Sequence, residues 1–351
     1  MKKFTLILAL MLTVGLVGAF AEVTVSGDVE HVIEVGEDTS QAFFTKGRVY
    51  FKSGFGEFSS ATLSFDGMKG TDVEPMVRDL YLQSDLAGAL GIDAVSLDAT
   101  VGSFYAAFTN GHLANWHDLR TPYFSMGRAI PGAIKLDLGI DPVVLHVGTV
   151  FSQGAVADNP DTTADETVVA DDKILAAYAG GISGDFGGAS FFLTYADADA
   201  KDDNAGSAFF AEAAYDLAIN DMTSVLVPVY FKYDLDAETW GYNAGVRATY
   251  DMVGVGAALV GDDVEALRNV DLDAEVAVTD AANVYVAAYL NLEADDNLQG
   301  LEVGANYKLD MVKFQAGYFL AADSVVTASD RYGWYGTPAQ SGFYIATDIA
   351  W

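Results

Sequence analysis

The first candidates for acid–base catalysis in this 351-residue sequence are its four histidines, His31, His112, His117 and His146. A hydrolase built on a membrane barrel would need one of them beside a carboxylate and a Ser or Asn. His117 and Asp118 are the one adjacent pair of this kind, but neighbours on a strand point to opposite faces. No G-x-S-x-G, H-E-x-x-H or phosphate-binding loop occurs. The sequence therefore predicts no catalytic residue and no enzyme activity.

Metal-binding residues are equally sparse. The chain has no cysteine, which excludes thiolate metal sites and disulfides. Acidic clusters within 158–172, 197–203, 262–265 and 293–296 could bind Ca²⁺ loosely through carboxylate oxygens. None of them has the spacing D-x-[DN]-x-[DN]-G of a calcium loop. We expect no specific metal site and no cofactor.

The charge of the chain excludes one large class of partner. Asp and Glu number 50 against 18 Lys and Arg, a formal net charge of −32. Nucleic acid is excluded because binding its backbone requires Lys and Arg to neutralise phosphates. Hydrophobic residues nevertheless make up 51% of the chain, and the mean hydropathy is +0.22. Such a chain is too apolar for acidic disorder, so apolar and acidic residues must be interleaved.

The first 21 residues predict a secretory signal peptide. They combine a basic start (Lys2, Lys3), an apolar core from Phe4 to about Val17 and a small-residue A-x-A end at 18–21. The apolar stretch is shorter than the ~20 residues of a spanning helix. We expect a mature chain of residues 22–351, exported to the periplasm. Loss of the two lysines takes the formal charge from −32 to −34 and leaves 16 basic residues.

The elements that position the remaining polar residues are strands. Val23, Val25 and Val29 alternate with Thr24 and Asp28, and this period of two recurs to the end of the chain. We expect about 18 strands of roughly 9 to 11 residues, the length that a tilted membrane-spanning strand needs. The number falls to 16 if residues 85–94 contain a short helix or if the segment 58–66 is not a strand. Short turns alternate with long polar loops, as in outer-membrane barrels. The predicted fold is an all-β, antiparallel, up-and-down transmembrane β-barrel.

The last segment, Phe343 to Trp351, alternates to an aromatic carboxy-terminus. Together with the signal peptide, the alternating strands and the acidic loops, it resembles a bacterial outer-membrane porin. Residues 77–82 and 95–105 are similar to the early strands of several porin groups. The resemblance implies a passive pore for small hydrophilic solutes and ions, surrounded by outer-membrane lipid. It also implies insertion by the barrel-assembly machinery, which reads the strand ending at Trp351, and leaves a monomer and a homotrimer open.

The polar face of the predicted strands carries both signs of charge. The predicted pore-lining residues are Lys46, Arg48, Lys52, Asp98, Lys135, Asp137, Arg247, Glu275 and Lys308. Porins commonly fold their third loop inward, so residues 106–124 are a candidate constriction loop, although an external loop is equally compatible. Its candidate residues are His112, Trp116, His117, Asp118 and Arg120. The acidic clusters of the other long loops would concentrate cations at the mouth and so predict a cation preference.

Two other functions stay open. A substrate-specific outer-membrane channel would show a row of aromatic residues along one lumen wall. The tyrosines with lumen parity, Tyr50, Tyr230, Tyr285 and Tyr289, are scattered over several strands, so the sequence shows no such row. A structural or surface-attachment barrel would instead present its acidic external loops to a surface layer or to divalent ions.

Overall fold

A closed antiparallel sheet of eighteen strands forms the wall of the protein in the computed structural model. The structure describes residues 23–36, 41–67, 76–108, 124–128, 133–151, 175–197, 207–264, 267–293, 297–321 and 341–350. The wall strands are β1 (Val23–Gly36), β2 (Gln41–Phe55), β3 (Ser59–Gly67), β4 (Met76–Asp85), β5 (Ser96–Ser103), β8 (Ala133–Ile140), β9 (Val143–Phe151), β10 (Leu175–Asp185), β11 (Ala189–Asp197), β12 (Ser207–Asn220), β13 (Thr223–Asp234), β14 (Thr239–Tyr250), β15 (Val253–Asp262), β16 (Asn269–Thr279), β17 (Ala282–Asn291), β18 (Leu298–Leu309), β19 (Val312–Ala321) and β20 (Gly342–Ala350).

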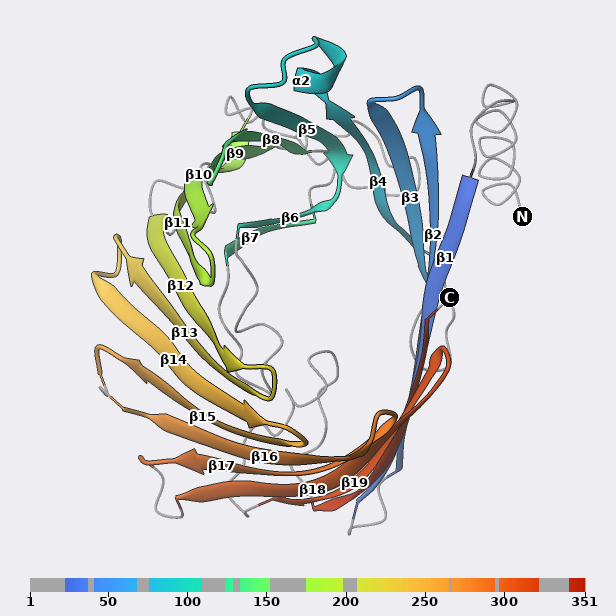
Figure 1. Ribbon diagram of the computed structural model, residues 1–351, viewed down its shortest axis with the longest axis vertical. Helices are drawn as coiled ribbons and strands as arrows, with labels where there is room; N and C mark the ends of the chain where they lie inside the picture. The colour runs from blue at the N-terminus through green and yellow to red at the C-terminus, as the bar shows by residue number, and fades with distance from the viewer. Residues whose placement is uncertain are drawn as a thin grey trace, which may run out of the picture.

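Each wall strand pairs with the next one along the chain, and β1 pairs with β20 to close the ring (Figure 1). This confirms the predicted all-β up-and-down barrel and the number of 18 strands. Residues 85–94 do contain a short helix, α2 (Leu86–Ala89), but β4 and β5 pair with each other beside it, so the number does not fall to 16. The uncertain segment 58–66 forms most of β3. No helix of the described residues is long and apolar enough to cross a membrane.

Two further strands leave the wall. β6 (Tyr105–Phe108) and β7 (Phe124–Arg128) pair only with each other, and β5 pairs directly with β8. In the end-on view the β6–β7 pair lies inside the ring (Figure 1), with β7 next to β10. Phe104, at the point where the chain turns inward, belongs to one buried apolar cluster with Ala179, Phe192 and Ala196. The sheet face that carries these three side chains is therefore the inner face.

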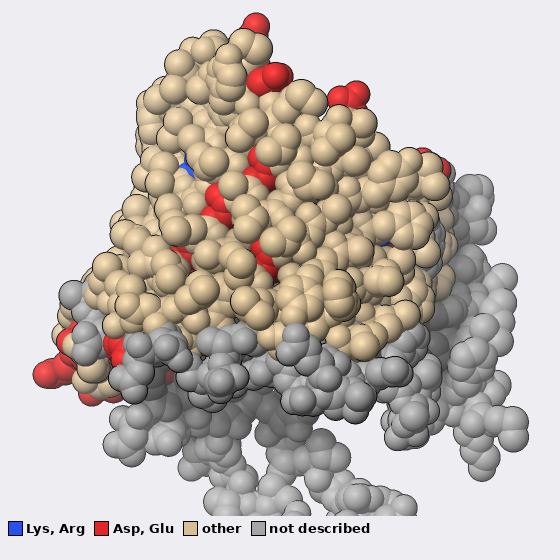
Figure 2. Space-filling model, turned by 90° about the horizontal axis from the view of Figure 1, so that it is seen from below, with Lys and Arg blue, Asp and Glu red and all other residues tan. Residues whose placement is uncertain are grey.

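The two faces of the sheet differ as the alternation predicts. Large apolar side chains stay exposed on the outer face, among them Val101, Val147, Leu193, Val303 and Ile345. The side view shows that residues other than Lys, Arg, Asp and Glu form most of the wall between its two rims (Figure 2). The inner face holds the buried polar side chains of Thr62, Ser64, Asp79, His146, Thr194, Glu212, Asn243 and Glu302.

Eight connections join the strands at one end of the barrel, seven of two or three residues and one of ten, which contains α2. A carboxylate lies in or directly before each of them. These residues are Glu57, Asp93, Asp141, Asp185, Asp221, Asp251, Asp280 and Asp310. All eight connections lie in the described part of the chain, and none contains Lys or Arg. Asp251 and Asp310 begin two-residue Asp-Met turns with φ of 52° and 54°, a left-handed conformation that Asp and Asn tolerate better than most residues. We call these eight residues the acidic turn rim.

Candidate functional site: the inner face of the barrel

All nine predicted pore-lining residues lie on the inner face of the sheet by register. Asp98 on β5 is opposite Asp137 on β8, for example, and Lys46 on β2 is opposite Glu30 on β1. The side chains of Lys52, Asp98 and Lys308 are exposed, whereas those of Arg48, Lys135, Asp137, Arg247 and Glu275 are half-buried. The structure brings two groups of them together, one around Arg247 and one around Asp137.

Arg247 on β14 binds two carboxylates on β16. Its Nη1 donates to Asp273 Oδ2 at 3.0 Å and its Nη2 donates to Glu275 Oε1 at 2.5 Å. The guanidinium reaches over β15, where Gly256 lies opposite both Arg247 and Asp273, and Gly254 lies opposite Glu275. One cation is thus shared by two carboxylates, and the cluster carries net negative charge.

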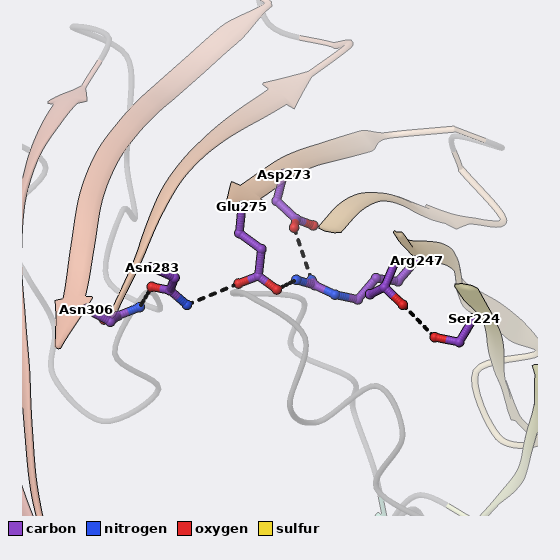
Figure 3. A network of polar contacts seen from close by, with 7 residues as sticks. Ser224, Arg247, Asp273, Glu275, Asn283 and Asn306 are labelled. Atoms are coloured by element: carbon purple, nitrogen blue, oxygen red, sulfur yellow. Dashed lines mark hydrogen bonds and ion pairs between the residues drawn. The ribbon is translucent and has the colours of Figure 1, made fainter. Parts of the chain in front are cut away.

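Amide side chains extend this cluster along the wall (Figure 3). Asn283 Nδ2 on β17 donates to Glu275 Oε2 at 3.4 Å, and Asn306 Nδ2 on β18 donates to Asn283 Oδ1 at 2.9 Å. On the other side, Ser224 Oγ on β13 lies 2.5 Å from Thr249 Oγ1 on β14. Figure 3 shows these side chains directed toward one another from neighbouring strands. The result is a polar belt across β13–β18, close to the acidic turn rim.

A second cluster joins β8, β9 and β10. Lys135 Nζ lies 2.9 Å from Asp137 Oδ2, and His146 Nδ1 lies 2.7 Å from Asp137 Oδ1. The other ring nitrogen, Nε2, lies 2.8 Å from Ser183 Oγ. Sequence reasoning assigned no role to His146 or Ser183. For His146 the signal available was its position between apolar residues in the alternating segment 143–151, but only the pairing register of β9 with β10 shows that it meets Ser183.

A third cluster surrounds Glu302 on β18, which is only 2% exposed. Tyr285 Oη donates to Glu302 Oε1 at 3.0 Å and Tyr289 Oη donates to Oε2 at 3.2 Å, while Tyr344 Oη also donates to Oε1. Gln315 Nε2 donates to Tyr285 Oη at 2.8 Å. Tyr285 and Tyr289 lie on β17 and Tyr344 lies on β20, so tyrosines of two strands meet at one carboxylate of β18. Tyr50 on β2 and Tyr230 on β13 lie on other strands, as the sequence predicts.

The candidate constriction loop is only partly described. Residues 106–108 belong to β6 and Phe124 begins β7, so the two ends of the loop form the hairpin inside the ring (Figure 1). His112, Trp116, His117, Asp118 and Arg120 lie outside the described residues. Whether these five side chains narrow the lumen stays a prediction.

Comparison with known proteins identifies the fold through solved structures alone. No protein-family model and no curated protein matches the sequence. Two engineered variants of the porin of Rhodopseudomonas blastica match with a TM-score of 0.55, at 14% and 13% sequence identity. In both, the alignment covers 94% of this chain and 100% of the porin. The barrel has a porin fold.

Within this porin fold, the His146 cluster occupies one sector of the inner face, and the Arg247 belt and the Glu302 cluster, which share β17 and β18, occupy another. The His146 cluster lies on β8–β10, the side that β7 approaches, and the Arg247 belt and the Glu302 cluster lie on β13–β20. A further similar structure, described as one of engineered proteins with asymmetric conductivity, has a TM-score of 0.54 and 14% identity. In the described residues no group of three or more His, Asp or Glu could hold a metal ion.

Proposed function

We propose that the protein is an outer-membrane porin through which small hydrophilic solutes and ions diffuse passively, with a preference for cations. The observation that carries this proposal is the division of a closed sheet into an apolar outer face and a polar, charged inner face. Lipid offers no hydrogen-bond partners to backbone groups, so only a closed sheet can span it with strands. Water inside such a barrel would solvate Lys52, Asp98 and Lys308. The nine inner-face residues named above would line the pore.

The cation preference rests on where the carboxylates lie. The acidic turn rim surrounds one mouth with negative charge, and the long loops at the other end hold further acidic clusters. Charged rims raise the local concentration of counter-ions and thereby their flux. The inner face itself mixes both signs, as in the Arg247 belt. Selectivity would therefore originate mainly at the mouths.

The proposal includes the partners that an outer-membrane porin requires. Lipid would contact the exposed apolar side chains of the outer face, and the barrel-assembly machinery would read β20 together with the aromatic Trp351 that follows it in the sequence. A homotrimer is the assembly that we propose. Residues 1–21 would be removed as a signal peptide on export. Residues 106–124 would form the constriction loop, because the hairpin from which they emerge lies inside the ring.

Single-channel recording tests this function. The mature chain, residues 22–351, is refolded and inserted into planar bilayers with a KCl gradient. We expect ohmic conductance. We also expect a reversal potential with the sign that preferential flow of K⁺ over Cl⁻ produces. Insertion without conductance would instead favour the surface-attachment barrel, and conductance with anion preference would contradict the cation assignment alone. Saturable block of the current by a solute would favour a substrate-specific channel.

A further inference from the structure

Asp137, His146 and Ser183 form a hydrogen-bonded row across three neighbouring strands of the inner face. Asp137 Oδ1 lies 2.7 Å from His146 Nδ1, and His146 Nε2 lies 2.8 Å from Ser183 Oγ. The order acid, imidazole, hydroxyl is that of a catalytic triad. Such triads occur on unrelated folds and are identified by the geometry and the roles of their three members. We propose that the row makes Ser183 a nucleophile that accepts an acyl group from a small, activated carboxylic ester inside the barrel.

The contact with Asp137 sets the tautomer of His146. An ionised carboxylate only accepts hydrogen bonds, so Nδ1 carries the proton and donates it to Oδ1. Nε2 is then the unprotonated nitrogen and accepts the hydroxyl hydrogen of Ser183, which is the arrangement that general-base catalysis requires. Lys135 binds the second carboxylate oxygen, Oδ2, at 2.9 Å and so leaves Oδ1 to His146.

The imidazole is held in place by packing as well. The ring of Phe192 stacks on His146 with 4.7 Å between the ring centroids and an interplanar angle of 23°. His146 is 8% exposed. Gly181 is the residue opposite His146 on β10, so no side chain at that register position crowds the ring. Ser183 is half-buried on the same face, and a substrate would reach it from within the barrel.

The reaction that follows from this geometry is acyl transfer. Ser183 Oγ attacks the ester carbonyl carbon while its proton passes to His146 Nε2. The bond to the alkoxide or phenoxide then breaks, and the leaving group takes that proton as it departs. The product is an acyl-serine, which water hydrolyses by the same route with His146 again acting as the base. No oxidant, reductant or metal takes part.

The position of Ser183 within the paired sheet limits the kinds of ester that can react. Ser183 is paired on both sides, with Val144 of β9 and Phe192 of β11, so the backbone N–H groups of this region belong to the sheet ladder. Loss of one N–H donor to an oxyanion lowers enzymatic rates about 10²–10³-fold. We therefore expect reaction with esters that have good leaving groups, such as p-nitrophenyl acetate, and with fluorophosphonates.

Ser224 provides the matched comparison. It also lies on the inner face of a wall strand and also forms a side-chain hydrogen bond, but its partner is Thr249 and not an imidazole. A hydroxyl that reacts merely because it lies inside the barrel would be labelled at Ser224 as well as at Ser183. A hydroxyl activated by His146 would be labelled at Ser183 alone.

The test treats the folded barrel in detergent with a fluorophosphonate and locates the adduct by mass spectrometry. We expect an adduct on Ser183, none on Ser224, and none on Ser183→Ala. His146→Gln and Asp137→Asn, checked for folding by gel shift on heating, should each slow labelling about 10²-fold or more, since general-base assistance contributes about 10²–10⁴.

Three results would overturn the proposal: no adduct on Ser183, equal labelling of Ser183 and Ser224, or undiminished labelling of folded His146→Gln. If that variant does not fold, the comparison of the two serines in the natural chain still decides. The labelling experiment does not depend on conductance. Its failure would therefore contradict the role of Ser183 without contradicting the proposed pore.

Discussion

Arg247 reaches Glu275 across the intervening strand β15, which presents a glycine where a side chain would crowd both residues. Nη2 of Arg247 lies 2.5 Å from Oε1 of Glu275, and the residue of β15 opposite Glu275 is Gly254. A Cβ atom on Gly254 would lie 3.1 Å from Glu275 Cγ and 3.3 Å from Arg247 Nη2. The Arg247 belt thus depends on a small residue between its charged members.

Replacing Arg247 should change both stability and selectivity. In Arg247→Gln the carboxylates of Asp273 and Glu275 lose their shared cation, and Asp273 has a side chain only 6% exposed. Hydrogen bonds to charged groups contribute about 1.5–3 kcal/mol each, which partial exposure of Arg247 and Glu275 reduces. We expect a loss of about 1–3 kcal/mol in the free energy of unfolding, measured in urea. The reversal potential should move further toward that of a purely cation-selective pore.

Arg247→Lys separates the two effects, because it keeps the charge and loses the two-pronged geometry. It should lose stability while its reversal potential stays near that of the natural chain. Equal shifts of the reversal potential in the Lys and Gln variants would show that the charge of Arg247 does not act on permeating ions.

A methyl group on Gly304 should disturb the Glu302 cluster. A Cβ atom there would lie 2.5 Å from Tyr285 Oη and 2.6 Å from its Cζ, so the ring must move away from Glu302. Leaving a buried polar group without a partner costs about 1–3 kcal/mol. We expect Gly304→Ala to lower the unfolding midpoint accordingly. Gly241→Ala is the control, because the nearest atom to its Cβ is Gly261 O at 3.7 Å. Equal midpoints for the two variants would show that the tyrosine ring adjusts freely.

Adjacent residues of β5 should respond differently to a new charge. Val101 is 45% exposed on the outer face, whereas Thr100 lies on the inner face opposite Lys135. Arginine on the lipid side costs up to about 2–4 kcal/mol near the membrane midplane. We expect Val101→Arg to reduce the yield and stability of barrels folded into vesicles. Thr100→Arg places a like charge opposite Lys135, which costs up to about 1 kcal/mol, and should reduce both much less. The reverse order would contradict the assignment of the two faces.

Neutralising the acidic turn rim should weaken the cation preference. The variant carries Asp221→Asn, Asp251→Asn, Asp280→Asn and Asp310→Asn together, and Asn tolerates the left-handed conformation of Asp251 and Asp310. We expect a smaller reversal potential in a KCl gradient, with the difference greatest at low salt because the Debye length grows from about 10 Å at 0.1 M to about 30 Å at 0.01 M. Glu238→Gln, in a turn at the other end, provides a control for unspecific effects. An unchanged reversal potential at low salt would exclude the rim as a source of selectivity.

Alternation along the sequence was sufficient to predict the strands and their faces, but not the contacts between them. Asp137 and Glu275 were expected on the inner face and are found there, since a period of two defines the face of each residue. The pairing of His146 with Ser183 depends on register as well. Sliding β10 by two residues would keep every side chain on its face and still separate the pair. Sequence periodicity carries no information about such a shift.

Two other features of the inner face could not be predicted from alternation. One is the arrangement of three tyrosines around Glu302. It requires glycine at positions 304 and 317, because the ring of Tyr285 lies over Gly304 and the ring of Tyr344 lies over Gly317. The inward turn after Phe104 was expected only from resemblance, because residues 106–124 show no pattern that distinguishes an inward loop from an external one.

The pairing of β1 with β20 has a consequence for how the protein is made. Val35 lies opposite Phe343 and Asp28 lies opposite Ala350, so the first and last described strands complete the ring together. Until β20 has been synthesised, β1 and β19 remain open edges, and such edges readily pair with other chains. Contacts between distant parts of a chain also form slowly. The polypeptide must therefore be shielded from self-association until β20 has paired with β1, and a chain truncated before Gly342 is expected to aggregate.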